Sequence, residues 1–410
     1  MKNSNINSNL LTSSAPPIEE MLALYEKNRN SLDLPLLDLS QAAPSAAPPK
    51  SLQRAIIESL GKPENHRYGA ILGKIELREA ITKRWNELYK SNIFYTEVGV
   101  TAGCNQAFCA SVNSVASAGD SVMVPFPCYF NHKMWLDMQG INIIELPCSK
   151  DLLPDIKVAR ELFSQSVKAI VLVTPNNPTG KEYPDNLLQE FADLVKEKNI
   201  SLILDETYRD FISDPCLHHT LLQRTDWRDW LIHLYSFSKA YRITGHRIGA
   251  FVTNSYRTKQ IEKFLDATTI CPNQLGQEAA LHGLKHLSKF LERERLTIIQ
   301  RKNTLSVAMK ELPDWKILSS GAFFAYVKYP MNISSIKFSE LLLKEVSLLV
   351  VPGSMFESKT SMKLHRDQTF RLAFANVKKI NLEAVVDRLK TFEGLFYEKY
   401  CVQPESSLER

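Results

Sequence analysis

Short apolar runs rich in β-branched residues recur between residues 97 and 252 and alternate with longer amphipathic segments. Continuous apolar runs of this length are typical of strands that are buried on both faces, as in a largely parallel sheet covered by helices. The chain is therefore predicted to have an α/β fold. The runs are EVGVT at 97–101, SVMVP at 121–125, INIIEL at 141–146, AIVLV at 169–173, SLILD at 201–205, LIHLYS at 231–236 and GAFV at 249–252 with its flank.

The segments on either side of this series predict a second, smaller α/β domain. A long charged helical pattern begins near Leu284 and leads into strand-like FFAYVKY, a helix, VSLLVVP, FRLAFAN and a final helix. Helical spacing also predicts a first helix over Ile18–Asn28. We expect a disordered leader at 1–17, a small domain from 18–49 and 295–410, and a large domain at 50–294.

Composition excludes several classes of protein. Lys and Arg total 50 against 45 Asp and Glu, and this excess is scattered, so no nucleic-acid partner is expected. No uncharged apolar stretch approaches the ~18 residues of a membrane span, and the Asn/Ser-rich leader does not resemble a signal peptide. The seven cysteines lack the paired spacing of a metal site, so we expect no metal and a reducing, cytoplasmic location.

Polar residues stand directly after several of the apolar runs. In an open α/β sheet, ligands bind at the carboxyl ends of the strands. One polar residue after a strand is ordinary turn chemistry, but several at the same edge predict a site. The residues are Gly103, Asn177, Asp205, Ser236 and Lys239.

The order and spacing of short motifs resemble fold-type I enzymes that depend on pyridoxal 5'-phosphate (PLP), specifically class I/II aminotransferases. The resemblance covers about Leu37 to Leu395. It implies a large domain with a mostly parallel sheet and a smaller α/β domain. The motifs are Tyr68-Gly69, Thr101-Ala102-Gly103, Asn176-Asn177-Pro178-Thr179-Gly180, Asp205-Glu206-Thr207-Tyr208, Ser236-Phe237-Ser238-Lys239, Arg247-Ile248-Gly249 and Phe370-Arg371-Leu372.

Lys239 matches the lysine that holds the cofactor as a Schiff base in this family. By itself a lysine after a strand is usually a solvated surface charge. Here a Ser-x-Ser precedes it and Arg247 follows eight positions on, as in the family. An amine reacts with the cofactor aldehyde only when neutral, so burial near cations should lower its pKa from ~10.4. The resemblance also implies that Lys239 moves protons as the general base.

Three further residues match groups that hold the cofactor ring. A buried carboxylate such as Asp205 could cap a helix or form an ion pair, but by resemblance it pairs with the protonated pyridine nitrogen. Tyr208 and Asn177 resemble the pair that hydrogen-bonds the phenolic oxygen, although NNPTG could also be a plain turn. Tyr129 matches the aromatic residue that stacks on the ring, with core packing as the competing interpretation.

The cofactor phosphate requires backbone N–H donors and positive charge, which a Gly-containing turn at a helix amino terminus supplies. Gly103, Cys104 and Asn105 fit this requirement, assisted by Ser236, Ser238 and Arg247. Tyr68 resembles the tyrosine that reaches the phosphate from the neighbouring subunit, although a loop tyrosine more often only packs. The resemblance therefore implies a homodimer with shared active sites.

Substrate contacts are less completely matched. Arg371 matches the arginine that grips the substrate α-carboxylate through a bidentate fork. The amino-terminal loop that usually presents a glycine here reads Gln41-Ala42-Ala43-Pro44, so we expect the backbone at Ala42 and Ala43 to contact substrate. Asn105 stands where aspartate-preferring relatives often have a lysine. We therefore expect a neutral or aromatic amino donor.

The predicted reaction is the transfer of an amino group from an amino acid to a 2-oxo acid by a ping-pong mechanism. A PLP-dependent lyase, such as a C–S β-lyase or an aminocyclopropane-carboxylate-synthase-like enzyme, would use the same residues and is the alternative. A transcriptional regulator would need a DNA-binding domain before the fold, and the leader leaves no room for one. A catalytically silent scaffold would be expected to lose the lysine.

Overall fold

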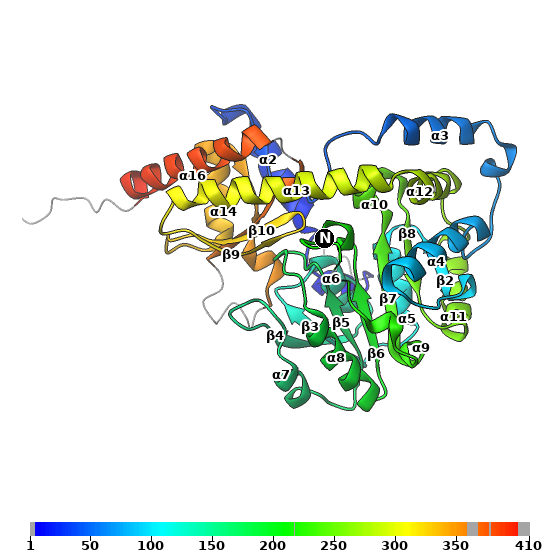
Figure 1. Ribbon diagram of the computed structural model, residues 1–410. Coiled ribbons are helices and arrows are strands. Elements are labelled where there is room, and N and C mark those ends of the chain that lie inside the picture. The colour runs from blue at the N-terminus through cyan, green and yellow to red at the C-terminus, as the bar shows by residue number, and fades with distance from the viewer. Residues whose placement is uncertain (1–4, 217, 359–367, 377–378, 401–410) are drawn as a thin grey trace, which may run out of the picture.

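The computed structural model describes residues 5–216, 218–358, 368–376 and 379–400. Figure 1 shows two lobes, one around a large sheet and one around a small sheet, with the long helix α13 (Ser288–Ala308) running along both. The chain is therefore an α/β protein with a second, smaller α/β unit, as expected from the sequence.

The large lobe contains a seven-stranded sheet of order β2-β8-β7-β6-β5-β3-β4. All strands are parallel except β8, which pairs antiparallel with both β7 and β2. Every predicted apolar run forms one of these strands, so the prediction of a largely parallel sheet is confirmed. The strands are β2 (Val98–Thr101), β3 (Ser121–Phe126), β4 (Asn142–Pro147), β5 (Val167–Val173), β6 (Ser201–Asp205), β7 (Leu231–Ser236) and β8 (Gly249–Val252).

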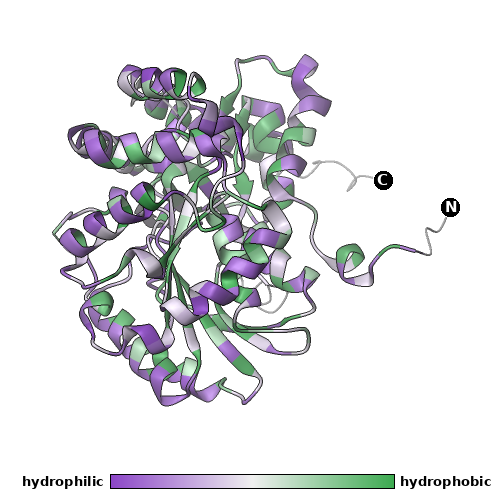
Figure 2. Ribbon diagram, turned by 90° about the vertical axis from the view of Figure 1, so that its right-hand side faces the viewer, coloured by the Kyte–Doolittle hydropathy of each residue, from purple (hydrophilic) through white to green (hydrophobic). Residues whose placement is uncertain are grey.

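Helices bury both faces of this sheet. Along β5, Ile170 and Leu172 belong to one hydrophobic cluster, whereas Val171 and Val173 belong to another, since successive side chains point to opposite faces. The helices alternate polar and apolar residues, as amphipathic helices do (Figure 2). The helices of the large lobe are α3 (Lys50–Leu60), α4 (Ile75–Tyr89), α5 (Cys104–Asn113), α6 (Phe130–Met138), α7 (Ile156–Glu161), α8 (Asp185–Glu197), α9 (Trp227–Trp230), α10 (Phe237–Ala240), α11 (Ser255–Thr269) and α12 (Gln274–His286), of which α3 packs on α12.

The small lobe contains a four-stranded antiparallel sheet of order β12-β13-β10-β9. The sequence predicts β10 (Phe324–Lys328), β12 (Val351–Pro352) and β13 (Thr369–Ala373) but not β9 (Lys316–Gly321), whose mixed residues are only partly buried. A separate parallel pair joins β1 (Leu37–Asp38) to β11 (Leu348–Leu349). Helices α13, α14 (Ser335–Val346) and α16 (Lys379–Tyr400) complete this lobe.

Part of the segment expected to be a disordered leader is helical. Helix α1 spans Ser8–Thr12 and is capped by Asn7, whose side chain accepts a hydrogen bond from the Asn9 amide at 2.9 Å. The Asn9 side chain also donates to the Met138 carbonyl at the end of α6. Local capping and this contact explain why the expectation of disorder is wrong for these residues. The predicted first helix is present as α2 (Pro17–Asn28).

The two lobes meet closely at two glycines. Gly180 ends the NNPTG loop with a φ of +68°, and a Cβ built on it would lie 2.4 Å from the amide nitrogen of Gly321, the last residue of β9. A Cβ on Gly321 would in turn clash with the Gly180 carbonyl oxygen. The backbones of the two lobes therefore touch directly here, with no room for a side chain on either.

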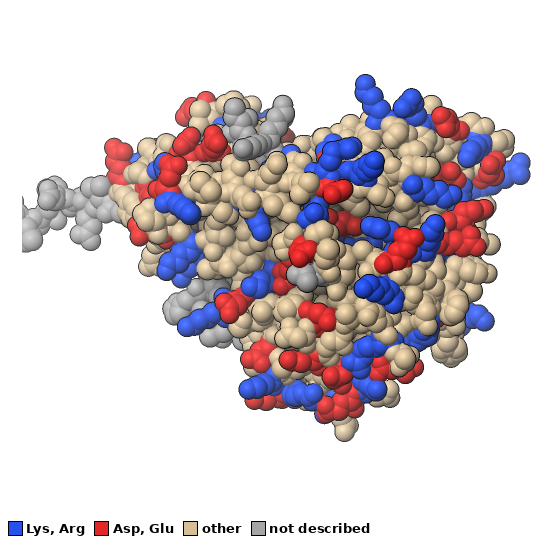
Figure 3. Space-filling model, in the orientation of Figure 1, with Lys and Arg blue, Asp and Glu red and all other residues tan. Residues whose placement is uncertain are grey.

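Charged residues of both signs are interspersed over the surface in view (Figure 3). Within the described part of the chain, none of the helices combines the length and the apolar character needed to span a bilayer. Short 3-10 helices complete the described structure; they are Arg29–Ser31, Pro63–His66, Tyr95–Glu97, Arg209–Phe211, Leu221–Gln223, Thr244–His246, Met309–Glu311, Gly353–Phe356 and Phe374–Asn376.

Candidate active site

A cavity of about 120 Å³ lies at the carboxyl ends of β5, β6 and β7, which is the edge predicted from the sequence. It gathers most of the residues singled out by their motifs and adds Val173, Thr207 and Thr244. Gly103 and Arg371 adjoin it through contacts with Arg247 and Asn177. The predicted residues that line the cavity are Cys104, Asn105, Tyr129, Asn177, Asp205, Tyr208, Ser236, Ser238, Lys239 and Arg247.

Lys239 projects from the short helix α10, which begins directly after β7. The Ser236 side chain accepts a hydrogen bond from the Ser238 amide at 3.3 Å and caps this helix. Burial, with added repulsion from Arg247 and Arg371, lowers the pKa of Lys239 to about 8. About a tenth of this amine is therefore neutral and nucleophilic at pH 7, far more than for an ordinary lysine.

Asp205 is a buried carboxylate at the end of β6. Burial alone would raise its pKa, but the interactions with His132 and Thr207 outweigh burial and leave the pKa below its ordinary value. His132 Nε2 lies 3.3 Å from Asp205 Oδ2, and the Thr207 amide donates to Oδ1 at 2.9 Å. His132 is itself fixed by stacking on Phe108, with 3.8 Å between ring centroids. The carboxylate is therefore held negative inside the cavity.

The turn before α5 adjoins the cavity that Lys239 lines. Gly103 has a φ of +85° and precedes α5, so the free amides of the helix amino terminus begin here. A Cβ on Gly103 would lie 2.2 Å from Arg247 Nη2, which shows how closely the guanidinium approaches the turn. The buried Ser238 hydroxyl has no hydrogen-bond partner among the described residues. Amides, a guanidinium and an unpaired hydroxyl together suit a phosphate group.

Two tyrosines border the cavity. Tyr208 packs edge to face against Phe323 and Phe324 of the small lobe, and burial raises its pKa. Burial also raises the pKa of Tyr129 to about 12. Both phenols thus remain protonated and can donate hydrogen bonds at neutral pH. The Tyr129 hydroxyl lies 3.5 Å from Asn105 Oδ1 and accepts a hydrogen bond from Asn131 at 3.0 Å.

Arg371 is a buried cation of the small lobe that contacts Asn177 in the cavity lining. It lies on β13, donates to Asn177 Oδ1 at 3.0 Å and also donates to the Ser40 carbonyl. Its Nε has no hydrogen-bond partner among the described residues, and burial lowers its pKa to about 10. The guanidinium therefore remains charged at neutral pH and keeps a free donor.

Besides Gly103 and Arg371, which adjoin the cavity, three predicted residues lie outside its lining. Tyr68 is 81% exposed, so it does not reach the site of its own chain. Ala42 packs against the hydrophobic cluster of the small lobe, and Ala43 is half-buried beside it. The Ser40 contact nevertheless places the loop that contains both alanines next to Arg371.

Sequence reasoning missed His132, Thr207 and Thr244. His132 carries no motif of its own, and its position opposite Asp205 depends on how α6 packs beside the sheet. Thr207 lies inside the motif Asp205-Glu206-Thr207-Tyr208, so its amide could have been proposed as a partner of Asp205. Thr244 accepts a hydrogen bond from Arg247 through its carbonyl at 3.0 Å, a contact that no side-chain pattern reveals.

Comparison with known proteins gives consistent matches. The family model described as aminotransferase class I and II matches residues 35–389. An aspartate aminotransferase of Thermotoga maritima is 29% identical over 323 residues, covering 78% of this chain and 84% of the relative. An aromatic aminotransferase of Arabidopsis thaliana is 28% identical over 365 residues, covering 86% of this chain and 89% of the relative.

Solved structures with the same architecture include enzymes named for either type of substrate. The aspartate aminotransferase of Thermotoga maritima superposes with a TM-score of 0.85 at 25% identity, covering 95% of this chain and all of the other. The aromatic aminotransferase of Pyrococcus horikoshii gives a TM-score of 0.81 at 26% identity, covering 92% of this chain and all of the other.

Proposed function

Because the chain belongs to the aminotransferase class I and II family and is a transaminase, we propose that the cavity around Lys239 is its active site and that PLP is its cofactor. The observation that carries this proposal is that Lys239, an amine with a pKa of about 8, lines the same cavity as a turn suited to anion binding and a buried carboxylate. These groups are what an aldehyde cofactor with a phosphate and a ring nitrogen requires.

The residues fit the cofactor group by group. The amides after Gly103, the Ser238 hydroxyl and Arg247 would hold the phosphate, and Ser236, Cys104 and Asn105 line the same cavity. Asp205 would hold the ring nitrogen. Tyr208 and Asn177 would bind the phenolic oxygen, and Tyr129 would cover the ring. Nothing in this set offers the ligand spacing of a metal, and the proposal requires none.

Once bound, the cofactor supplies an electron sink for the carbanion at the substrate α-carbon. The chain supplies charge and proton transfer around it. Asp205 stays negative because His132 and the Thr207 amide stabilise its carboxylate, so it favours a protonated ring nitrogen. Lys239 Nζ, when neutral, accepts the proton from the substrate α-carbon as general base.

Substrate binding would depend on Arg371. Its buried guanidinium is positioned by Asn177 and by the Ser40 carbonyl to bind an α-carboxylate. The backbone of Ala42 and Ala43 would border the same carboxylate. Asn105, beside Tyr129, offers an amide, which cannot form an ion pair with a second carboxylate on the substrate. We therefore propose a neutral or aromatic amino donor and a 2-oxo acid acceptor. The relatives are named for aspartate and for aromatic substrates, and the donor panel described below distinguishes the two classes.

We also propose a cytoplasmic homodimer with shared active sites and the expected division into two domains. The exposed Tyr68 supports the shared sites, because a side chain that projects from its own subunit is available to a neighbouring one. The lyase alternative is not favoured, since the relatives reported above are named as aminotransferases.

The visible spectrum of the purified protein tests the proposal. The wild type should show the absorbance of a lysine-bound cofactor, and borohydride should fix the cofactor at Lys239. Lys239→Ala should lose both properties. A wild type that stays colourless after incubation with PLP would contradict the cofactor assignment. A donor panel then tests specificity, and a fast half-reaction with aspartate but none with neutral or aromatic amino acids would overturn the proposed donor.

A further inference from the structure

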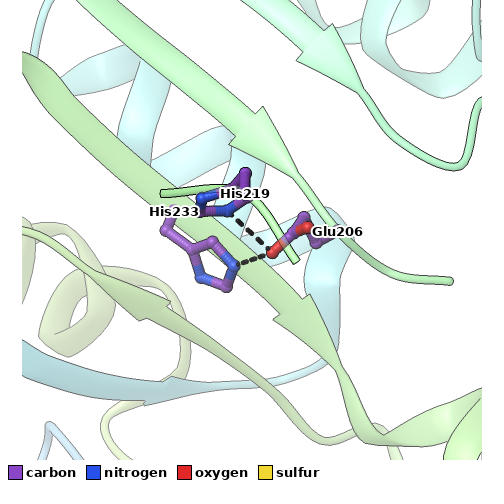
Figure 4. Close-up of side chains that lie close together, drawn as sticks. All are labelled: Glu206, His219 and His233. Atoms are coloured by element: carbon purple, nitrogen blue, oxygen red, sulfur yellow. Dashed lines mark hydrogen bonds and ion pairs between the residues drawn. The ribbon is translucent and has the colours of Figure 1, made fainter. Parts of the chain in front are cut away.

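A second cluster of ionisable residues lies next to the proposed active site, since its member Glu206 directly follows Asp205 in the chain. Glu206, His219 and His233 are all at least 95% buried, and Glu206 Oε2 lies 3.2 Å from His219 Nε2 and 2.7 Å from His233 Nε2 (Figure 4). Two histidines and a carboxylate around one point are also ligands that suit a transition metal. The surroundings of the two rings decide between a metal site and a hydrogen-bond network.

The opposite nitrogen of each ring accepts a hydrogen bond. His219 Nδ1 accepts from the Leu221 amide at 3.3 Å, and His233 Nδ1 lies 3.5 Å from the indole nitrogen of Trp85, which can only donate. A neutral imidazole with an accepting Nδ1 carries its proton on Nε2. Both Nε2 atoms therefore donate to Glu206, and neither has a lone pair free for a metal. The cluster is a hydrogen-bond network.

The network continues to an arginine three residues after Glu206. The Tyr89 hydroxyl donates to Glu206 Oε2 and accepts from Arg209 Nη1 at 3.2 Å. The Arg209 guanidinium lies over the ring of Trp85 at 3.5 Å and over that of Tyr235 at 4.1 Å. We call Tyr89, Glu206, Arg209, His219 and His233 the Glu206 network. It connects α4, β7 and the chain after β6.

The segment that the network holds is the one that presents the proposed cofactor contacts. Asp205 and Tyr208 line the cavity, whereas Glu206 and Arg209, which alternate with them, enter the network on the other side. The segment is fixed further by Asp210, which accepts a hydrogen bond from Tyr235 at 2.6 Å. Because Glu206 directly follows Asp205, a shift of the Glu206 backbone also shifts the backbone that carries Asp205.

We propose that Glu206 is a positioning residue for the transamination site, and that the Glu206 network fixes Asp205 and Tyr208 against the cofactor from behind the sheet. This inference rests on the proposed function. Its physical basis is that a buried carboxylate with three donors has one stable position, because each lost donor would leave a buried polar group unpaired. Small displacements of positioned groups have large effects on rate.

The test compares Glu206→Gln with the wild-type holoenzyme. The amide keeps the shape of the side chain but removes the charge that orders the three donors. We expect the PLP dissociation constant to rise about tenfold and kcat to fall by a similar factor, with the KM for the amino donor changed less than about twofold. The visible circular dichroism of the bound cofactor should change, because it reports the orientation of the ring.

Glu97→Gln is a matched control. Glu97 is also a buried carboxylate and accepts two hydrogen bonds from Arg228, but it lies at the amino end of β2, away from the cavity. Its loss should lower the melting temperature and leave PLP affinity and dichroism unchanged. Tyr89→Phe removes one hydroxyl of the Glu206 network, so it provides a milder second variant. Its effect should not add to that of Glu206→Gln, because both break the same network.

Two results would overturn the inference. One is a Glu206→Gln protein that loses thermal stability but keeps wild-type PLP affinity, dichroism and kcat, because the network would then be structural only. The other is stoichiometric zinc in the purified wild type that is absent from Glu206→Gln. A wild type that does not bind PLP at all would instead contradict the proposed function, so the two failures are distinguishable.

Discussion

The guanidinium of Arg371 donates a hydrogen bond of 3.0 Å to the side-chain carbonyl of Asn177, although the two residues are 194 positions apart. Arg371 lies on a strand of the small sheet, and Asn177 follows a strand of the large sheet. The two lobes are thus joined at the point where the proposed substrate carboxylate and the cofactor's phenolic oxygen would meet. A change at either residue should therefore affect substrate binding and the chemical step together.

Arg371→Lys tests the proposed carboxylate contact. Lysine keeps the charge but cannot form the planar fork, and a lost charged hydrogen bond costs about 2 kcal/mol. We expect the KM for the amino donor to rise at least about 30-fold, with PLP affinity unchanged, in steady-state kinetics. Arg257→Lys is the control, since this half-buried arginine donates hydrogen bonds to Thr253 and Ser201, which do not line the cavity. Equal effects of the two substitutions would contradict the assignment.

The lowered pKa of Lys239 predicts how cofactor uptake depends on pH. Burial disfavours the ammonium form, so the neutral amine becomes dominant above about pH 8 rather than above its ordinary value. The rate at which PLP reconstitutes the apoenzyme should rise with pH and level off above about 8. Stopped-flow absorbance measures this rate. A rate that continues to rise through pH 10 would show an ordinary lysine.

Asn105→Lys should shift the donor preference toward aspartate. The new ammonium group would lie in the cavity beside Tyr129, where it could pair with a distal carboxylate. We expect kcat/KM for aspartate to rise at least about tenfold, which corresponds to ~1.4 kcal/mol, while the value for a neutral donor falls. In Asn105→Met the new side chain is about as long as lysine but carries no charge, so kcat/KM for aspartate should not rise. A gain with methionine would attribute the effect to shape.

Tyr68 can be assigned to one subunit or the other by mixing variants. If Tyr68 serves the neighbouring site, a hybrid of Lys239→Ala and Tyr68→Ala chains contains one site with both residues intact. Refolding the two weak variants together should then recover activity approaching half of the wild type per hybrid dimer. If Tyr68 serves its own chain, or if the protein is a monomer, mixing should recover nothing.

Gly103→Ala tests the anion-binding turn. The added Cβ would overlap Arg247 Nη2 and would strain a residue whose φ is +85°. We expect the PLP dissociation constant to rise at least about tenfold in an equilibrium titration. Gly245→Ala is the matched control, because a Cβ there meets no atom within 4 Å although Gly245 lies two residues from Arg247. Similar losses in both variants would argue against a specific role of the turn.

Apolar runs and the residues that follow them predict the large sheet and most of the cavity lining. Asp205, Ser236 and Lys239 are predictable because a parallel sheet brings the carboxyl ends of its strands to one edge. The same logic fails for β9. Its residues, Lys316–Gly321, contain no continuous apolar run, and the strand is recognised only from its pairing with β10.

Contacts that depend on packing between distant elements could not be predicted. His132 meets Asp205 only because α6 and the end of β6 lie at the same edge of the sheet. The Glu206 network joins residues separated by up to 144 positions, and neither histidine carries a recognisable spacing. Helix α1 was missed for the opposite reason, since its stability comes from a local cap within a polar sequence. The roles of the site residues remain predictions, those of Tyr68, Ala42 and Ala43 among them.

The contact between Gly180 and Gly321 has a consequence for how this protein can diverge. Neither position has room for a side chain, because a Cβ on one glycine would overlap the backbone of the other. No single substitution at one position can be compensated at the other, since both already have the smallest side chain. Neither glycine can therefore be replaced by one substitution after another. The surrounding residues can vary only as long as the two backbones keep the same separation.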